Sequence, residues 1–174
     1  MPTIFAHAVS AVALGSHYKR SERPPRFWIL AIVCSVLPDI DVLGFNIGIR
    51  YGDLFGHRGI SHSLLFAFIV GLLVVLSAFR SIPRFSRQWF SMILFFFLVT
   101  ASHGFLDALT SGGLGIAFFS PFDTTRYFFP WTPVLVAPIG IGSFFNHRGF
   151  RVLISEFLWI WIPSIFDDDD ESVH

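Results

Sequence analysis

The stretch WFSMILFFFLVTASHGFLDAL, residues 89–109, decides the fold of this chain. An apolar run of about 20 residues is long enough for one helix to cross a bilayer. His103 and Asp107 lie near its end, and their spacing puts both side chains on one face of a helix. Ionisable groups at membrane depth cost several kcal/mol unless they are paired or bound. The stretch therefore predicts a membrane-spanning helix with a polar site at one end.

The composition of the whole chain agrees with a membrane environment. Of its 174 residues, 53% are hydrophobic and 14% are charged, whereas soluble domains carry about 25% charged residues. A net charge of zero argues against nucleic acid as a partner. Cys34 is the single cysteine, which excludes both a disulfide framework and a cysteine-rich zinc site.

The apolar residues fall into six segments, at residues 3–18, 27–45, 60–79, 89–109, 134–145 and 150–166. They predict an all-α fold, a polytopic transmembrane helical bundle of five to six segments. The fifth segment is short and contains Pro138 and two glycines, so we expect it to be broken or re-entrant. We treat residues 1–166 as one membrane-embedded domain and expect the acidic tail, residues 167–174, to be disordered.

The basic residues predict the orientation of this bundle. Nine of the 12 lysines and arginines lie in the loops that follow the first, third and fifth segments. The alternate loops contain only Arg50, Arg58 and Arg126. Because cytoplasmic loops carry an excess of Lys and Arg, we expect a multi-pass protein of the cytoplasmic (inner) membrane whose basic loops face the cytoplasm.

Helix geometry then converts sequence distance into depth. With a rise of about 1.5 Å per residue, six polar residues lie about 18 to 30 Å above the basic residues at the cytoplasmic ends of their segments. These are His7, Asp39, Asp41, His62, His103 and Asp107. Four segments therefore deliver ionisable groups to one layer near the outer face. Glu156 comes out only about 8 Å above Arg151, so we exclude it from this layer.

Asp39 and Asp41 follow Pro38 at the end of the second segment. Proline breaks or kinks a helix, so two aspartates separated by one residue need not point to opposite sides. Such a pair can bind cations. The alternative is a helix end that carries solvated carboxylates, and the preceding apolar run makes that alternative the weaker one.

The motif HRGISHS, residues 57–63, opens the third segment. His57 and His62 are candidate ligands, and the planar donors of Arg58 suit a phosphate or a carboxylate. The alternative is a loop that caps the helix, with Ser61 as the N-cap and Arg58 on a lipid headgroup.

His103 and Asp107 give the sharpest local signal because helical spacing can present both to one cation. A simple hydrogen bond between them is the alternative. His7 is weaker evidence, since a lone histidine on a helix is usually satisfied by packing. Histidine and aspartate together are ligands for zinc or manganese, so we expect a metal site.

Residues 38–41, 57–63 and 103–107, with Thr110 and Gly113, resemble the YdjM family, described as membrane-bound metal-dependent hydrolases. That family is in turn thought to be distantly similar to zinc-dependent phospholipase C. The resemblance implies one or two divalent ions, with zinc the first choice and manganese the second. The ligands that it implies are His7, Asp39 or Asp41, His57 or His62, His103 and Asp107.

We therefore expect hydrolysis of a phosphoester on a lipid or lipid-linked headgroup at the outer face of the cytoplasmic membrane. The metal would activate water, and Asp39 or Asp41 would accept a proton as the catalytic base. Arg58, with Arg50 and Arg126 as helpers, would bind the phosphate as a catalytic and substrate-binding group. Expected partners are membrane lipids and a phosphorylated lipid substrate, with no nucleic acid. The oligomeric state is left open.

Two other classes of function use the same residues. A transporter for divalent cations or protons also needs intramembrane histidine and aspartate, although transporters usually place such sites near the midplane between repeated halves. A membrane scaffold with a structural metal site is the third possibility, and an open coordination position would distinguish an enzyme from it.

Overall fold

The computed structural model describes residues 1–19, 23–137 and 147–166. The α-helices within these ranges are α1 (Ile4–Ser16), α2 (Pro25–Val36), α3 (Leu64–Ala78), α4 (Arg87–Ala108), α5 (His147–Glu156) and α6 (Ile162–Phe166), and the π-helical turn η5 (Phe157–Trp161) joins α5 to α6. Over these residues the chain forms no β-strand, and its only strand-like pairings are isolated bridges between Thr110 and Val134 and between Ile116 and Tyr127. The predicted all-α fold class is confirmed. The expected tail, residues 167–174, lies outside the described residues.

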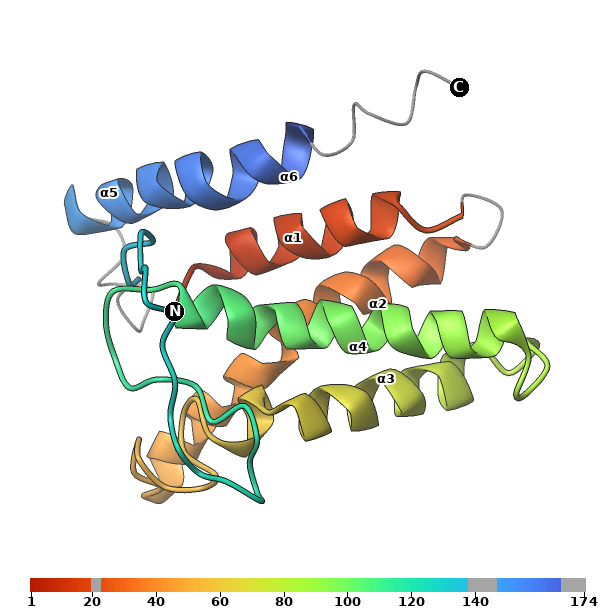
Figure 1. Ribbon diagram of the computed structural model, residues 1–174, viewed down its shortest axis with the longest axis horizontal. Helices are drawn as coiled ribbons and strands as arrows, with labels where there is room; N and C mark the ends of the chain where they lie inside the picture. Colours follow the sequence, from red (N-terminus) through yellow and green to blue (C-terminus); the bar gives the residue numbers. More distant parts are fainter. Residues whose placement is uncertain (20–22, 138–146, 167–174) are drawn as a thin grey trace.

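The helices run roughly along one common direction, as Figure 1 shows, and α4 packs against α1, α2 and α3. Two helical segments are long and apolar enough to cross a membrane, namely α4 and the continuous segment Pro25–Ile47. The helices α1 and α3 are apolar but shorter. Because only two segments meet the length criterion, the expected five to six crossings are not established.

Pro38 marks a change of helix type in the segment Pro25–Ile47. The α-helix α2 ends at Val36, and the tighter 3₁₀ helix η2 (Leu37–Ile47) follows. Proline is tolerated here because it occupies the first turn of the new helix, where its missing N–H has no helical partner. Asp39 therefore lies on a 3₁₀ turn rather than on a regular continuation of α2.

Hydroxyl side chains begin three of the helices. Thr3, Ser63 and Ser86 accept hydrogen bonds from backbone N–H groups at the starts of α1, α3 and α4. Such N-caps satisfy donors that the first helical turn leaves unpaired. The alternative interpretation of residues 57–63 had Ser61 as the N-cap of the third segment. The cap is Ser63 instead, because residues 60–62 form the separate 3₁₀ turn η3 (Ile60–His62) before α3 begins.

The main apolar core joins the aromatic residues of α2 and α4. Phe27 stacks on Phe95 with ring centroids 4.4 Å apart, and Phe96 and Val99 continue the core along α4. Gly71 brings α3 very close to α4, since a Cβ atom at this position would lie 2.8 Å from the backbone nitrogen of Phe97. Small residues at such crossings allow the close helix packing that membrane bundles use.

The fifth apolar segment does not carry the chain to the opposite end of the bundle. Residues 134–137 are not helical, and residues 138–146 lie outside the described residues. Leu135 donates a hydrogen bond to Ser155 of α5, and Ser111, His147 and Arg151 line one pocket. The start of α5 therefore lies beside the C-terminal end of α4.

This geometry corrects two predictions made from the basic loops. Arg148 and Arg151 lie at the same end as Ser111, rather than at the opposite end with the loop that joins α3 and α4. Glu156, which the depth estimate excluded, accepts hydrogen bonds from the backbone and the hydroxyl of Thr3, directly before α1. Both depth estimates depended on placing the start of α5 at the opposite end of the bundle. The exclusion of Glu156 from the metal-binding residues still holds, because neither candidate group among the described residues contains it.

Candidate metal centre

Five ionisable side chains meet at the end of the bundle where α1 and α3 begin and α4 ends. The helix α1 contributes His7, η2 contributes Asp39, η3 contributes His62, and α4 contributes His103 and Asp107. The side chains of all five are at most 10% exposed. The convergence predicted from helix depth is therefore present for these five residues.

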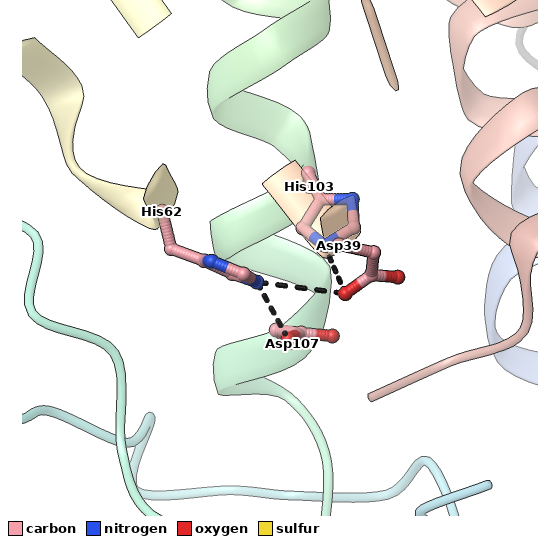
Figure 2. A group of neighbouring side chains, drawn as sticks. All are labelled: Asp39, His62, His103 and Asp107. Atoms are coloured by element: carbon pink, nitrogen blue, oxygen red, sulfur yellow. Dashed lines mark ion pairs between the residues drawn. The ribbon is translucent and has the colours of Figure 1, made fainter. Parts of the chain in front are cut away.

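Four of these side chains form a compact group, which Figure 2 shows. Asp39 Oδ1 lies 3.3 Å from His103 Nε2 and 3.7 Å from His62 Nε2. His62 Nε2 also lies 3.5 Å from Asp107 Oδ2. One ligand atom from each of the four residues falls within 4.8 Å of all the others. We call this group, Asp39, His62, His103 and Asp107, the inner cluster.

The inner cluster contains buried polar atoms that no described residue satisfies. His62 Nε2, His103 Nε2 and both carboxylate oxygens of Asp39 have no hydrogen-bond partner within the described parts of the chain. A buried polar atom without a partner costs about 1–3 kcal/mol, and native proteins contain few of them. Two imidazole nitrogens and two carboxylates match the donor set of a zinc or manganese site. The residues present therefore fit a divalent metal.

His7 lies beside the inner cluster. Its ring stacks on that of His103 with centroids 3.8 Å apart, and its Nε2 atom lies 3.8 Å from Asp107 Oδ1. Neither ring nitrogen of His7 has a hydrogen-bond partner among the described residues. His7 could therefore act as a further ligand, as the sequence predicted.

The other ring nitrogens of the two cluster histidines are held by the protein. His103 Nδ1 lies 2.7 Å from the carbonyl oxygen of Ser35, which can only accept, so Nδ1 carries the proton. His62 Nδ1 lies 3.2 Å from Asp41 Oδ2. Contacts of this kind orient metal-ligating histidines and raise their basicity. Both histidines consequently direct Nε2 into the inner cluster.

The structure separates the two aspartates that the sequence left as alternatives. Asp39 faces the inner cluster, whereas Asp41 accepts hydrogen bonds from His57 Nδ1, Ser61 Oγ and the backbone nitrogen of Arg58. Asp41, His57 and His62 form a second group that could hold an ion. Because its oxygens already have several donors, we interpret Asp41 first as the residue that orients His62.

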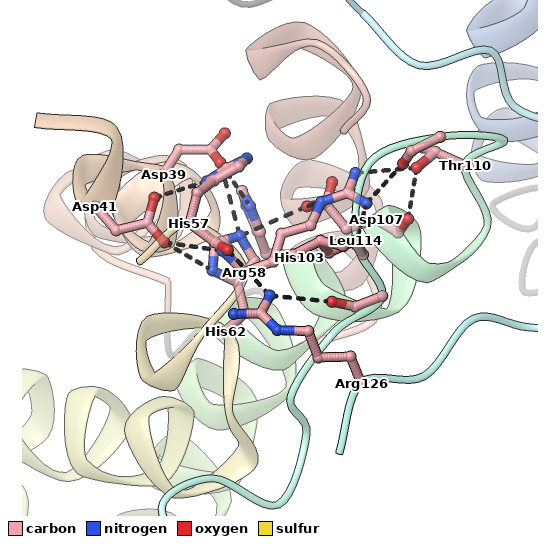
Figure 3. Close-up of polar contacts among 12 residues, drawn as sticks. Asp39, Asp41, His57, Arg58, His62, His103, Asp107, Thr110, Leu114 and Arg126 are labelled. Atoms are coloured by element: carbon pink, nitrogen blue, oxygen red, sulfur yellow. Dashed lines mark hydrogen bonds and ion pairs between the residues drawn. The ribbon is translucent and has the colours of Figure 1, made fainter. Parts of the chain in front are cut away.

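Arg58 is fully buried, and Figure 3 shows its guanidinium surrounded by protein acceptors. Its Nη1 atom donates to the carbonyls of Gly112 and Leu114, and its Nη2 atom donates to the hydroxyl of Thr110. Its Nε atom lies 3.2 Å from Asp107 Oδ2. The sequence predicted a free donor for phosphate. The structure instead places Arg58 behind Asp107, where it fixes that carboxylate.

The two other arginines predicted as phosphate helpers differ from Arg58 and from each other. Arg126 donates to backbone carbonyls, including those of His57 and Tyr51, and so fixes the loop around the second group. Arg50 is 86% exposed and pairs with Asp53 at 3.2 Å. The N–H and guanidinium of Arg50 lower the pKa of Asp53, which lies outside the helical spans. Arg50 is therefore a surface residue of the loop.

Gly113 is required by the loop that surrounds Arg58. Its φ is +83°, and a Cβ atom would lie 2.8 Å from Tyr51 Oη and 3.0 Å from Arg58 Nη1. Gly48 has a similar φ of +85°, but a Cβ atom there would have nothing within 4 Å. The two glycines share the backbone constraint and differ only in the space available.

We expect Gly113→Ala to lower the free energy of unfolding more than Gly48→Ala does. Both variants pay for a left-handed backbone, about 1–3 kcal/mol, and Gly113→Ala must also displace Tyr51 or Arg58. Chemical denaturation of the purified variants measures the difference. Equal destabilisation would contradict the close packing around Arg58.

These features define an all-helical membrane protein with a buried histidine–aspartate cluster. The chain belongs to the YdjM inner membrane protein family, which matches residues 1–166. It is also similar to inner membrane protein YbcI of Escherichia coli (strain K12), with 38% identity over 170 residues that cover 95% of this chain and 94% of the relative. No solved structure gives a significant match.

Proposed function

We propose that this protein is a metal-dependent hydrolase that cleaves a phosphoester of a lipid or lipid-linked headgroup at the outer face of the inner membrane. The observation that carries the proposal is the inner cluster, where unpartnered imidazole and carboxylate atoms from separate elements converge. Family membership supports the membrane location. The resemblance drawn from the sequence motifs supports the reaction class.

Asp39, His62, His103 and Asp107 would hold the metal, with His7 as a further ligand. A bound divalent metal supplies a Lewis acid for the phosphoryl oxygen and lowers the pKa of water. Asp39 is the best placed proton acceptor because its oxygens are free of protein donors and it is the most exposed member of the inner cluster. Arg58 acts through Asp107, since its guanidinium is already engaged.

Detection of the hydrolysis products tests this proposal: a phosphomonoester and an alcohol from each phospholipid, and inorganic phosphate from each polyprenyl phosphate. Purified wild-type protein is stripped of metal, reloaded with Zn²⁺ or Mn²⁺, and incubated with a panel of phospholipids and polyprenyl phosphates. We expect turnover only in the metal-loaded wild type, and activity at background for His103→Ala. His147→Ala is the matched control, because His147 is exposed on α5 and outside the inner cluster. Turnover by metal-free protein, or full activity in His103→Ala, would overturn the proposal.

Burial favours a second candidate, a structural metal site in a membrane scaffold. The side chains of the inner cluster are at most 10% exposed, and closed coordination is typical of structural zinc. The same assay distinguishes the two functions. Stoichiometric metal that His103→Ala loses, together with no turnover of any tested phosphoester, would support the structural site.

A further inference from the structure

An apolar groove of about 610 Å³ is lined mainly by residues of α1, α4 and α6. Its walls include Ser10 and Leu14 of α1, Ala101, Ser102 and Phe105 of α4, and Pro163 of α6. In Figure 1, α1 lies between α4 and α6, and α1 packs against both. The groove follows α4 from Phe97 to Leu106, about 14 Å of helix.

The groove offers an apolar surface with few polar donors. Its described lining contains no Asp, Glu, Lys or Arg, and its polar members are Ser10, Ser102, Ser164 and His17, whose Nδ1 atom lies 2.9 Å from the carbonyl oxygen of Ala13. The hydroxyls of Ser10 and Ser102 donate to the carbonyls of Ala6 and Val99 in their own helices, so these two donors are already used. The chemistry of the groove therefore suits a hydrocarbon chain rather than a polar or charged ligand.

One end of the groove lies at the same level along the helices as the metal centre. On α4, Ser102 and Leu106 line the groove, and their sequence neighbours His103 and Asp107 belong to the inner cluster. On α1, Ser10 lies one helical turn after His7 and on the same face. Leu64 of the lining follows His62 by two residues. The groove therefore reaches the depth of the inner cluster, while the cluster side chains themselves are buried on another face of α4.

We propose that this groove binds one acyl chain of a membrane phospholipid. Bilayer phospholipids supply such chains at high local concentration, and the groove lies on α4, a helix that is long enough to span the bilayer. If the hydrolase proposal is correct, the bound lipid is the substrate, and the groove determines where its headgroup lies relative to the inner cluster. That last step rests on the proposed function, whereas lipid binding itself does not.

Native mass spectrometry of the protein in detergent, with added dioleoyl phosphatidylglycerol, measures retained lipid. We expect Ser102→Trp to lower retention about tenfold or more, because excluding even two methylene groups from burial costs about that factor in affinity. Ala13→Phe fills the groove from α1 and should lower lipid retention in the same way. Leu94→Trp is the matched control, since Leu94 is 54% exposed on α4 and lies outside the groove.

Circular dichroism shows which variants are folded, and a folded Ala13→Phe tests the groove even if Ser102→Trp does not fold. Wild-type retention in either folded groove variant, or preferential retention of undecaprenyl phosphate over the phospholipid, would overturn the assignment. The metal-site variant His103→Ala should retain lipid as wild type does. If no hydrolysis product forms while lipid retention stays intact and depends on the groove, the hydrolase proposal fails and the lipid-binding proposal remains supported.

Discussion

Chelation lowers the melting temperature of the wild-type protein by about 10 °C and leaves that of His103→Ala unchanged. This is the expected result if the inner cluster holds a metal, because a ligand bound at a thousand times its Kd adds about 4 kcal/mol to the free energy of unfolding. For a chain of this size, each kcal/mol shifts the melting temperature by about 2–4 °C. Scanning calorimetry with and without chelator measures both proteins.

His147→Ala is the matched control and should respond to chelation as wild type does, because His147 is exposed and outside the inner cluster. Metal analysis before and after chelation reports occupancy independently of the melting temperature. A wild-type protein that contains stoichiometric metal and melts at the same temperature without it would contradict a stabilising metal in the cluster. Retained stoichiometric metal in His103→Ala would exclude His103 as a ligand.

Arg58→Met is expected to lower the free energy of unfolding by about 3–5 kcal/mol. Removing one partner of a buried ion pair leaves the other charge uncompensated, and here that charge is the Asp107 carboxylate. The variant also strips donors from the carbonyls of Gly112 and Leu114. Chemical denaturation of the metal-free protein gives the loss without any contribution from bound metal.

Arg50→Met is the matched control, because Arg50 is exposed and surface substitutions usually change stability by less than about 0.5 kcal/mol. Arg58→Lys should recover only part of the loss, since lysine lacks the planar set of donors that reaches Thr110, Gly112 and Leu114 together. A fully stable Arg58→Met would show that Asp107 does not depend on Arg58.

The sequence predicted the positions of the cluster residues well wherever the chain between them is regular helix. Residues His7, His103 and Asp107 lie on α1 and α4, where a constant rise per residue makes depth proportional to sequence distance. The estimate failed for Glu156 and for Arg148 and Arg151. In that part of the chain it depended on a crossing that the structure does not make.

The different roles of the residues in the metal centre could not be predicted from the sequence. Asp39 and Asp41 are chemically identical, and only their tertiary neighbours show that one faces the inner cluster and the other holds His57 and His62. The role of Arg58 could not be predicted either. Its acceptors lie 52 to 56 residues away in the sequence, so the local motif could not show that its guanidinium is already engaged.

The contact between Thr3 and Glu156 has a consequence for how the protein is made. It joins residues separated by 153 positions, and Thr3 lies one turn before His7. During synthesis the first helix emerges from the ribosome long before the helix that carries Glu156. The contact at Thr3 therefore forms only after the residues up to Glu156 have been translated, and a truncated chain that ends before Glu156 lacks it.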